Sequence, residues 1–186
     1  MITPKITNSR VTLGPVTLCY VHLLEPYAHE QGETPKYSCT ILVPKSAKET
    51  VEALRKAVDD AKAYGVRERW NGKKATAGKD NPLKDGDEKD DEHFKNCWYI
   101  NARSNRRPGV IGRNNEPLTT EDEVYSGMIA LVSVEFFPYQ MGGNGIAAAI
   151  ANVKKVKDGE RFTASGPSAE AELGGIALDE EEEDDI

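Results

Sequence analysis

The sequence predicts a small β-barrel that carries one helix and ends in a disordered acidic tail. Segments in which polar and apolar side chains alternate recur between residues 10 and 157, and only one segment repeats its apolar residues at helical spacing. From residue 165 onward the chain is small, polar and acidic, which is typical of disorder. We therefore expect one domain over residues 1–162 and a tail over residues 163–186. Strands do not alternate regularly with helices, so a doubly wound α/β fold is disfavoured.

The strand signals are alternating polarity and a high content of β-branched residues, and the clearest ones fall at residues 10–24, 36–43, 96–104 and 124–139. In the first, Gly14-Pro15 indicates a bulge or bend. In the last, Val132, Val134 and Phe136 share the apolar side. Residues 146–157 are ambiguous, because their alanines favour a helix whereas the preceding glycine-rich turn favours a hairpin strand.

One helix is expected over residues 46–64. Ser46 and Glu49 match a capping box, and the apolar positions that follow repeat at a spacing of three and four. Residues 71–92 are polar and glycine-rich, and we expect a long exposed loop of the kind that is usually functional or disordered. A partly open antiparallel barrel with one helix suits this pattern, and the OB fold is the main such class that binds oligonucleotides.

Charge is segregated along the chain. Of the 31 acidic residues, nine lie in residues 169–186, which contain no Lys or Arg. The rest of the chain has 22 acidic against 24 basic residues, so a slightly basic body carries an acidic tail. Blocks of like charge often serve as interaction tails. Such a tail could compete with phosphates for a basic groove and contact partner proteins once displaced, or it could only aid solubility.

Composition disfavours several classes of protein. The three cysteines form no CxxC pair, which argues against a zinc site and a disulfide framework and favours buried thiols in a reducing cytoplasm. No apolar run is long enough for a transmembrane helix, and the N-terminus lacks the apolar region of a secretory signal, so we expect no membrane association.

Catalytic and cofactor motifs are weak. His22, His29 and His93 have no nucleophile motif nearby, so we expect structural or surface histidines and no catalytic residue. Residues 143–148 match G-x-G-x-x-A, but no βαβ unit can follow, which favours a hairpin turn and no cofactor. The carboxylates of residues 85–92 do not match an EF-hand, and we expect no metal. A Mg²⁺-dependent nuclease that uses them remains the enzymatic alternative.

Basic and aromatic side chains on the polar strand faces favour binding of single-stranded nucleic acid. Cationic grooves follow the phosphates of a single strand, and exposed rings stack its bases. Tyr99, Phe137 and Tyr139 are expected to stack bases, while the ring of Tyr37 falls in the core phase of its strand. The expected DNA-binding residues are Lys36, Tyr37, Lys73, Lys74, Tyr99, Asn101, Arg103, Arg106, Arg107, Arg113, Phe137 and Tyr139. A protein-interaction adaptor that works mainly through its acidic tail is a third hypothesis.

Short motifs, in this order, give the chain a resemblance to a known family: Pro82–Asp87, Arg107–Ile111, Val124–Gly127, Gly145–Val153 and Lys157–Glu160. The chain resembles the phage and prophage single-stranded DNA-binding proteins with an OB fold. This resemblance implies a β-barrel core and non-catalytic coating of single-stranded DNA during replication or recombination. It also implies a phage or prophage protein in the cytoplasm of a bacterial host, and it makes residues 146–157 a strand.

The tail is similar in kind to those of bacterial and other phage single-strand-binding proteins. It implies contacts with replication or recombination proteins. It departs from the bacterial form, because it ends in Asp184-Asp185-Ile186 without an apolar tip of the Pro-Phe type. Exposed sheet edges or exchange of tails would also allow a homodimer.

Overall fold

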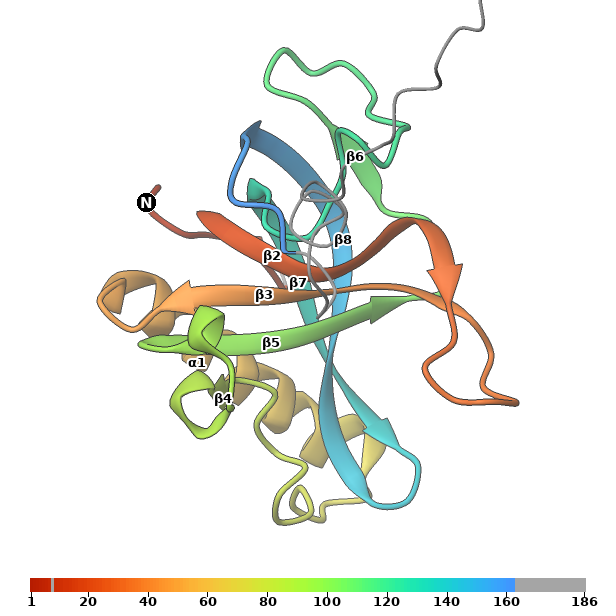
Figure 1. The fold of residues 1–186 in the computed structure, drawn as a ribbon. Coiled ribbons are helices and arrows are strands. Elements are labelled where there is room, and N and C mark those ends of the chain that lie inside the picture. The colour runs from red at the N-terminus through yellow and green to blue at the C-terminus, as the bar shows by residue number, and fades with distance from the viewer. Residues whose placement is uncertain (8, 163–186) are drawn as a thin grey trace, which may run out of the picture.

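The computed structural model describes residues 1–7 and 9–162, and β-strands dominate it (Figure 1). The strands are β1 (Lys5–Thr7), β2 (Arg10–Tyr27), β3 (Lys36–Pro44), β4 (Lys84–Asp85), β5 (Cys97–Ser104), β6 (Gly109–Ile111), β7 (Ile129–Gln140) and β8 (Asn144–Lys157). The helical elements are α1 (Lys48–Tyr64), the π-helical turn η1 (Gly65–Arg69), and the 3₁₀ turns η2 (Gly86–Glu88) and η3 (Glu92–Phe94). The acidic tail expected at residues 163–186 lies outside the described residues.

Five strands close into a barrel. β2 pairs antiparallel with β3 and β7, β3 with β5, and β7 with β8. A parallel pairing of β5 with β8, at Ala102 and Ala148, completes the ring. The predicted class, a small barrel with one helix, is confirmed, but the barrel is mixed rather than antiparallel. Residues 146–157 form a strand, and the G-x-G-x-x-A segment is the start of β8 after a hairpin turn.

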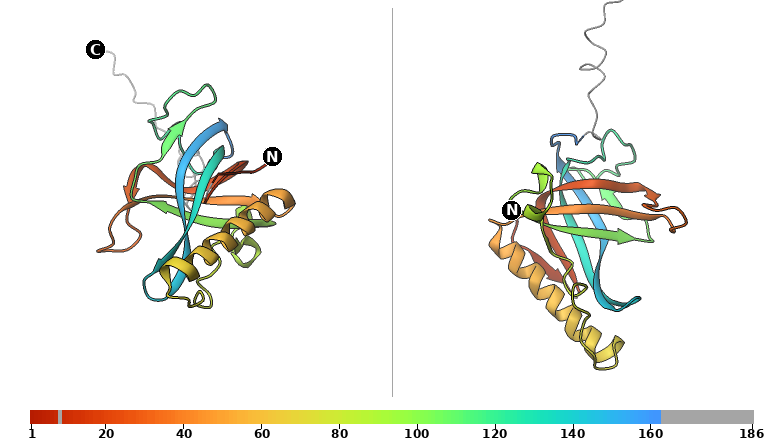
Figure 2. Two further views of the ribbon diagram at one scale, coloured as in Figure 1. Left: turned by 180° about the vertical axis from the view of Figure 1, so that it is seen from behind. Right: turned by 60° about the horizontal axis from the view of Figure 1, so that its bottom comes forward.

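The barrel interior is one apolar cluster built from the predicted strand phases. Val132, Val134 and Phe136 of β7 are all buried, as expected. Helix α1 lies across one end of the barrel and packs its apolar stripe against β7 and β2 (Figure 2). Cys19 and Cys39 are buried free thiols, and burial raises the pKa of Cys19 to about 12. Within the described part of the chain, no helix is both long enough and apolar enough to cross a membrane.

The helix begins later than its sequence motif predicts. Ala47, not Ser46, is the N-cap residue, and no side chain caps the helix. The chain first turns after β3, with the Ala47 N–H donating to the Pro44 carbonyl at 3.0 Å. The Lys48 N–H then donates to the Ser46 carbonyl at 2.9 Å, so Ser46 belongs to the turn. The predicted capping box is therefore wrong, because the turn uses the residues that would have formed it.

Residues 71–92 are less irregular than the predicted loop. They contain β4 and η2, and Leu83 is buried. Lys45 follows β3, and its ammonium group lies 2.6 Å from both the Asp85 and the Asp87 carboxylates. Asp87 also accepts a hydrogen bond of 2.8 Å from the Asn96 N–H. A buried leucine and paired carboxylates thus fix a segment whose composition is that of a loop.

Strand β2 is irregular at three places, the last of which is a register shift between His22 and Tyr27. Its register shifts between Leu13 and Val16, where Gly14-Pro15 predicted a bulge. A second shift falls between Cys19 and His22. There Tyr20 has a φ of 48°, and its side chain is exposed. A positive φ is uncommon for a residue other than glycine.

Trp70 ties the end of the helical segment to β7. Its side chain is fully buried, its ring lies against Gly65, and its Nε1–H donates to the Tyr139 carbonyl at 3.0 Å. We expect Trp70→Ala to lower the free energy of unfolding by about 3–5 kcal/mol, because it opens a cavity and removes this hydrogen bond. Urea denaturation measures the change. Tyr64→Ala, which truncates an exposed ring on α1, is the control and should change it by less than about 0.5 kcal/mol. Equal effects of the two variants would contradict this packing.

The ion pairs of Lys45 predict a pH-dependent stability. Hydrogen bonds from its ammonium group are the main cause that lowers the pKa of the Asp85 and Asp87 carboxyls from the ordinary value of 3.8. The stabilisation is therefore present above that value and is lost as the pH falls through the lower pKa of the folded protein. Lys45→Met should be less stable than the wild type at about pH 7, and the difference should shrink at about pH 3.

Urea denaturation at the two pH values measures this difference. Lys48→Met, which removes an exposed lysine at the start of α1, serves as the matched control. A Lys45→Met deficit that stays constant from neutral to acid pH would show that the carboxylates do not carry the effect.

Candidate nucleic-acid interface

A groove of about 860 Å³ lies where β8 diverges from β5, and we call it the basic groove. Residues 78–84 form one wall, β5 forms the floor, and the outer sides of β7 and β8 form the other wall. The cations that line it are Lys36, Lys79, Lys84, Arg103 and Arg106. Among the described residues, no Asp or Glu lines it. The groove therefore suits a ligand with several negative charges.

Backbone hydrogen bonds hold the first wall in place. The Ile146 N–H donates to the Lys79 carbonyl at 2.9 Å, and the Thr76 N–H donates to the Asn144 carbonyl at 2.8 Å. The Asn144 N–H returns a hydrogen bond of 3.0 Å to Thr76 Oγ1. The Lys79 ammonium also donates to the Gly142 carbonyl. This segment is thus attached along the start of β8, and it brings Lys79 and Lys84 to the groove.

The second wall is aromatic and apolar. Phe137 and Tyr139 both project from the outward phase of β7, and the Phe137 side chain is 40% exposed. The ring of Tyr139 lies against Gly145, where an added Cβ would come within 2.3 Å of the ring. Small alanine side chains of β8 leave the rest of this wall open. Flat rings beside a row of cations are the two components that bind a single strand.

The floor side chains have partners of their own. Arg103 Nη1 lies 2.9 Å from Glu33 Oε1, on the hairpin that joins β2 to β3. The pKa of Glu33 is lowered, first by a hydrogen bond from the His29 N–H and also by Arg103. Thr40 Oγ1 donates to Asn101 Oδ1 at 2.8 Å. Neighbouring side chains therefore orient both groove residues: Glu33 of the β2–β3 hairpin holds Arg103, and Thr40 of β3 holds Asn101.

The structure brings half of the predicted DNA-binding residues to the basic groove, namely Lys36, Asn101, Arg103, Arg106, Phe137 and Tyr139. Lys79, Lys84, Asn81 and Asn105 also line it but were not among the predicted residues. The lysines of the predicted loop at residues 71–92 gave a signal for this wall, but the sequence does not reveal which part of that loop docks beside β8.

The remaining predicted residues lie elsewhere. Tyr99 is half-buried and meets Phe94 edge-on, at 5.2 Å between ring centroids. Tyr37 is half-buried on the core phase of β3, as expected, and does not line the groove. Lys73 and Lys74 are exposed in the turn before Thr76. Arg107 and Arg113 are exposed and flank β6 in the sequence, and β6 lies at the end of the barrel away from the β7–β8 hairpin (Figure 1).

The carboxylates of residues 85–92 do not form a metal centre. Asp85 and Asp87 face Lys45, and Asp91 accepts the His93 N–H at 2.9 Å. Residues 1–7 and 9–162 contain no group of three or more His, Cys, Asp or Glu side chains that could hold a metal ion. These carboxylates stabilise the local turns, and the nuclease hypothesis loses the cluster on which it depended.

Two comparisons of the sequence match phage proteins. A family model described as "Enterobacter phage Enc34, ssDNA-binding protein" matches residues 9–186. Protein p50 of Acyrthosiphon pisum secondary endosymbiont phage 1 is 31% identical over 183 residues, which cover 94% of this chain and 97% of p50.

Solved structures agree with these matches. The single-stranded DNA-binding protein from bacteriophage Enc34 in complex with ssDNA superposes with a TM-score of 0.74 at 27% identity, covering 83% of this chain and 90% of that one. The single-stranded DNA-binding protein gp2.5 of bacteriophage T7 gives a TM-score of 0.55 at 13% identity, covering 95% and 97%. This second likeness is one of fold alone, and it confirms an OB-like barrel.

Proposed function

The chain belongs to the family of phage single-stranded DNA-binding proteins represented by that of Enterobacter phage Enc34, and we propose that it holds the DNA strand in the basic groove. Membership makes it a non-catalytic protein that binds single-stranded DNA. The position of the strand on this chain, the contacts it makes and the biological role are the proposal.

One observation carries the assignment of the groove. Five cations and two aromatic rings line it, and no carboxylate does so in the part of the chain that the structure describes. Lysine and arginine neutralise phosphates and release counterions, which supplies most of the affinity for any nucleic acid. Phe137 and Tyr139 offer ring faces that single-stranded bases can stack on, whereas the bases of a duplex are already stacked.

The chemistry of the groove supports a coating role rather than recognition of a sequence. Every base has a π-face, so stacking on Phe137 and Tyr139 accepts any base. Phosphate contacts fix register and carry no sequence information. A protein of this kind would cover exposed strands in the host cytoplasm during phage replication or recombination.

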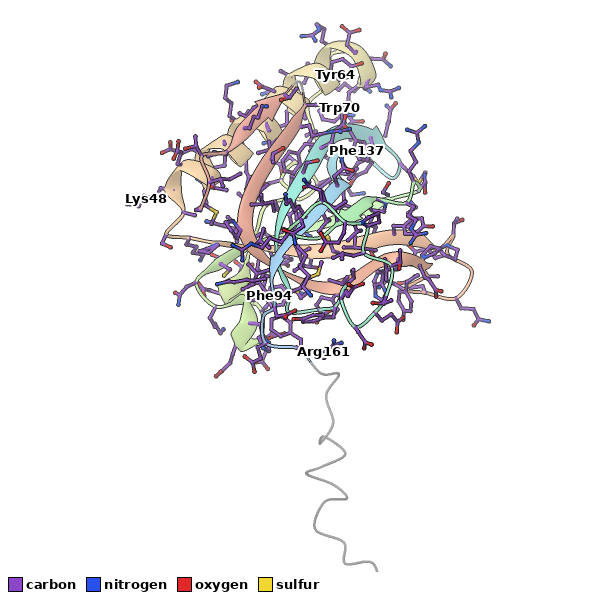
Figure 3. The ribbon with its side chains drawn as sticks, turned by 90° about the horizontal axis from the view of Figure 1, so that it is seen from above. Lys48, Tyr64, Trp70, Phe94, Phe137 and Arg161 are labelled. Atoms are coloured by element: carbon purple, nitrogen blue, oxygen red, sulfur yellow. The ribbon has the colours of Figure 1, made fainter. Side chains whose placement is uncertain are left out.

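The acidic segment 169–186 is proposed to compete with DNA for the basic groove. Phe162 is the last described residue, and it packs on His93 at 3.8 Å between ring centroids. It also packs against the cluster of Cys19, Leu42 and Phe94 on the outer face of β2 and β3. Figure 3 shows Phe94 and Arg161 at the same end of the molecule. From there an extended chain covers up to about 3.5 Å per residue, so residues 163–186 are long enough to reach the groove.

Displacement by DNA would free these nine acidic residues. They would then be available to basic surfaces of replication or recombination proteins through the same Coulomb attraction. In this proposal DNA binding and partner binding are coupled, because one segment serves both.

Neighbouring arginines provide a matched test of the groove. Arg106 and Arg107 are both exposed, but only Arg106 lines the basic groove. Arg106→Gln should weaken oligo-dT binding at low salt by up to about 1 kcal/mol, or roughly fivefold. It should also reduce the slope of log affinity against log salt by about 0.7, the value for one phosphate contact on a single strand. Fluorescence titration over a range of salt concentrations measures both.

Arg107→Gln should leave both quantities unchanged. Equal losses in the two variants would place the strand elsewhere on the protein. A wild-type protein that fails to bind oligo-dT even at low salt would refute the function itself.

Removal of residues 169–186 tests the role of the tail. The truncated protein should bind single-stranded DNA more tightly and discriminate less against duplex DNA, because a competing anion has been removed. A full-length variant with the nine acids changed to Gln or Asn is the control for length and should behave like the truncation. Parallel titrations with both ligands provide the measurement. Unchanged affinities for both would leave the segment with a solubility role only.

A further inference from the structure

A second, smaller hollow adjoins the basic groove on the outer face of β2, β3 and β5. It measures about 260 Å³, and we call it the Tyr20 hollow after its most exposed ring. Asn101 and Arg103 line both the hollow and the basic groove, so the two are continuous. We infer that the Tyr20 hollow holds a nucleotide of the same DNA strand, with its base stacked on Tyr20. This inference rests on the proposed function and extends it across the sheet.

The exposure and backbone conformation of Tyr20 suit its ring for stacking on a base. Tyr20 is 57% exposed, more than any other Tyr, Phe or Trp of the described residues. It lies at the irregularity of β2 between Cys19 and His22, and its φ is 48°. Bulges re-aim side chains, and strained backbone in a residue other than glycine is often retained for function. The backbone conformation thus exposes a large ring that could otherwise have packed on the sheet.

The hollow beside this ring suits one nucleotide. The Tyr20 ring centroid lies 6.5 Å from that of Phe94, which is buried beneath the same surface. Ser38 and Thr40 of β3 are among the residues that line it. Ser38 Oγ is buried and has no hydrogen-bond partner among the described residues, so its desolvation is uncompensated in the free protein.

The charged side chains that line the hollow are cationic. Lys89 and Arg103 lie on opposite elements of its lining, and no acidic residue of the described chain lines it. The Lys89 ammonium lies 5.6 Å from the Phe94 ring centroid. A strand that leaves the basic groove past Arg103 would therefore meet one more ring, that of Tyr20, and one more cation, Lys89. This alternation of phosphate and base contacts is what a single strand requires.

Oligonucleotide length separates the two parts of the site. An oligo-dT of about 4 nucleotides can occupy the basic groove alone, whereas one of about 16 can cover both parts. Tyr20→Ala should weaken binding of the long oligonucleotide roughly fivefold or more and leave binding of the short one nearly unchanged. Tyr20→Gly should behave like Tyr20→Ala. Glycine adopts a positive φ without strain, so this variant separates the loss of the ring from an effect of backbone strain. Tyr20→Phe keeps the ring and should bind like the wild type.

Photocrosslinking gives an independent readout. A long oligo-dT that contains 5-iododeoxyuridine should crosslink to Tyr20, and peptide mass spectrometry would identify the site. Tyr64→Ala truncates an exposed ring on α1 that lines neither the basic groove nor the Tyr20 hollow, and it is the matched control. Thermal unfolding verifies that each variant is folded.

The outcomes are distinguishable. A wild-type protein that binds neither oligonucleotide overturns the proposed function together with this inference. A wild-type protein that binds both, while Tyr20→Ala and Tyr20→Gly lose nothing with the long one, overturns the inference alone. A loss for Tyr20→Ala that is equal with the short and the long oligonucleotide also overturns it, because the ring would then belong to the basic groove.

Discussion

The basic groove depends on how β8 satisfies the hydrogen bonds of its free edge. β8 meets β5 at a single pairing, Ala102 with Ala148, so the start of β8 has β7 on one side and no barrel strand on the other. Backbone groups at such an edge need partners. Residues 76–79 supply them through Thr76 and the Lys79 carbonyl. The same contacts separate this segment from β5 and so create the groove, and they bring Lys79 and Lys84 to it.

The positive character of the groove comes from where the carboxylates lie. Outside residues 169–186 the acidic and basic residues nearly balance, so the body as a whole is only weakly basic. Asp85 and Asp87 are directed to Lys45, and Asp80 lies 3.6 Å from Lys62. Acidic residues that adjoin the groove in sequence thus pair with lysines outside it. A local field of one sign can arise in this way without a large net charge.

Strand phase is predictable from sequence, whereas docking is not. Side chains alternate with a period of two, so the sequence alone assigns Asn101, Arg103, Phe137 and Tyr139 to outward faces. The parallel β5–β8 pairing and the attachment of residues 76–79 depend on backbone groups, which every sequence shares. Tyr99 illustrates the remaining difficulty, because its outward phase is right but Phe94 of the neighbouring segment covers its ring. The sequence does not single out Tyr20, because no residue type marks the position of a bulge within a run of β-branched residues.

The ion pair between Arg103 and Glu33 bears on how the protein could release a DNA strand. The guanidinium at the centre of the floor already has an anionic partner, held on the hairpin between β2 and β3. An incoming phosphate would replace the Glu33 carboxylate, and this carboxylate would return when the phosphate leaves. Arg103 would therefore have an anionic partner both with and without DNA. Both side chains are partly exposed, so the exchange of one anion for another changes the electrostatic energy little. If DNA binds in the basic groove as proposed, binding and release at Arg103 would therefore be an exchange of anions rather than the making and breaking of an isolated ion pair.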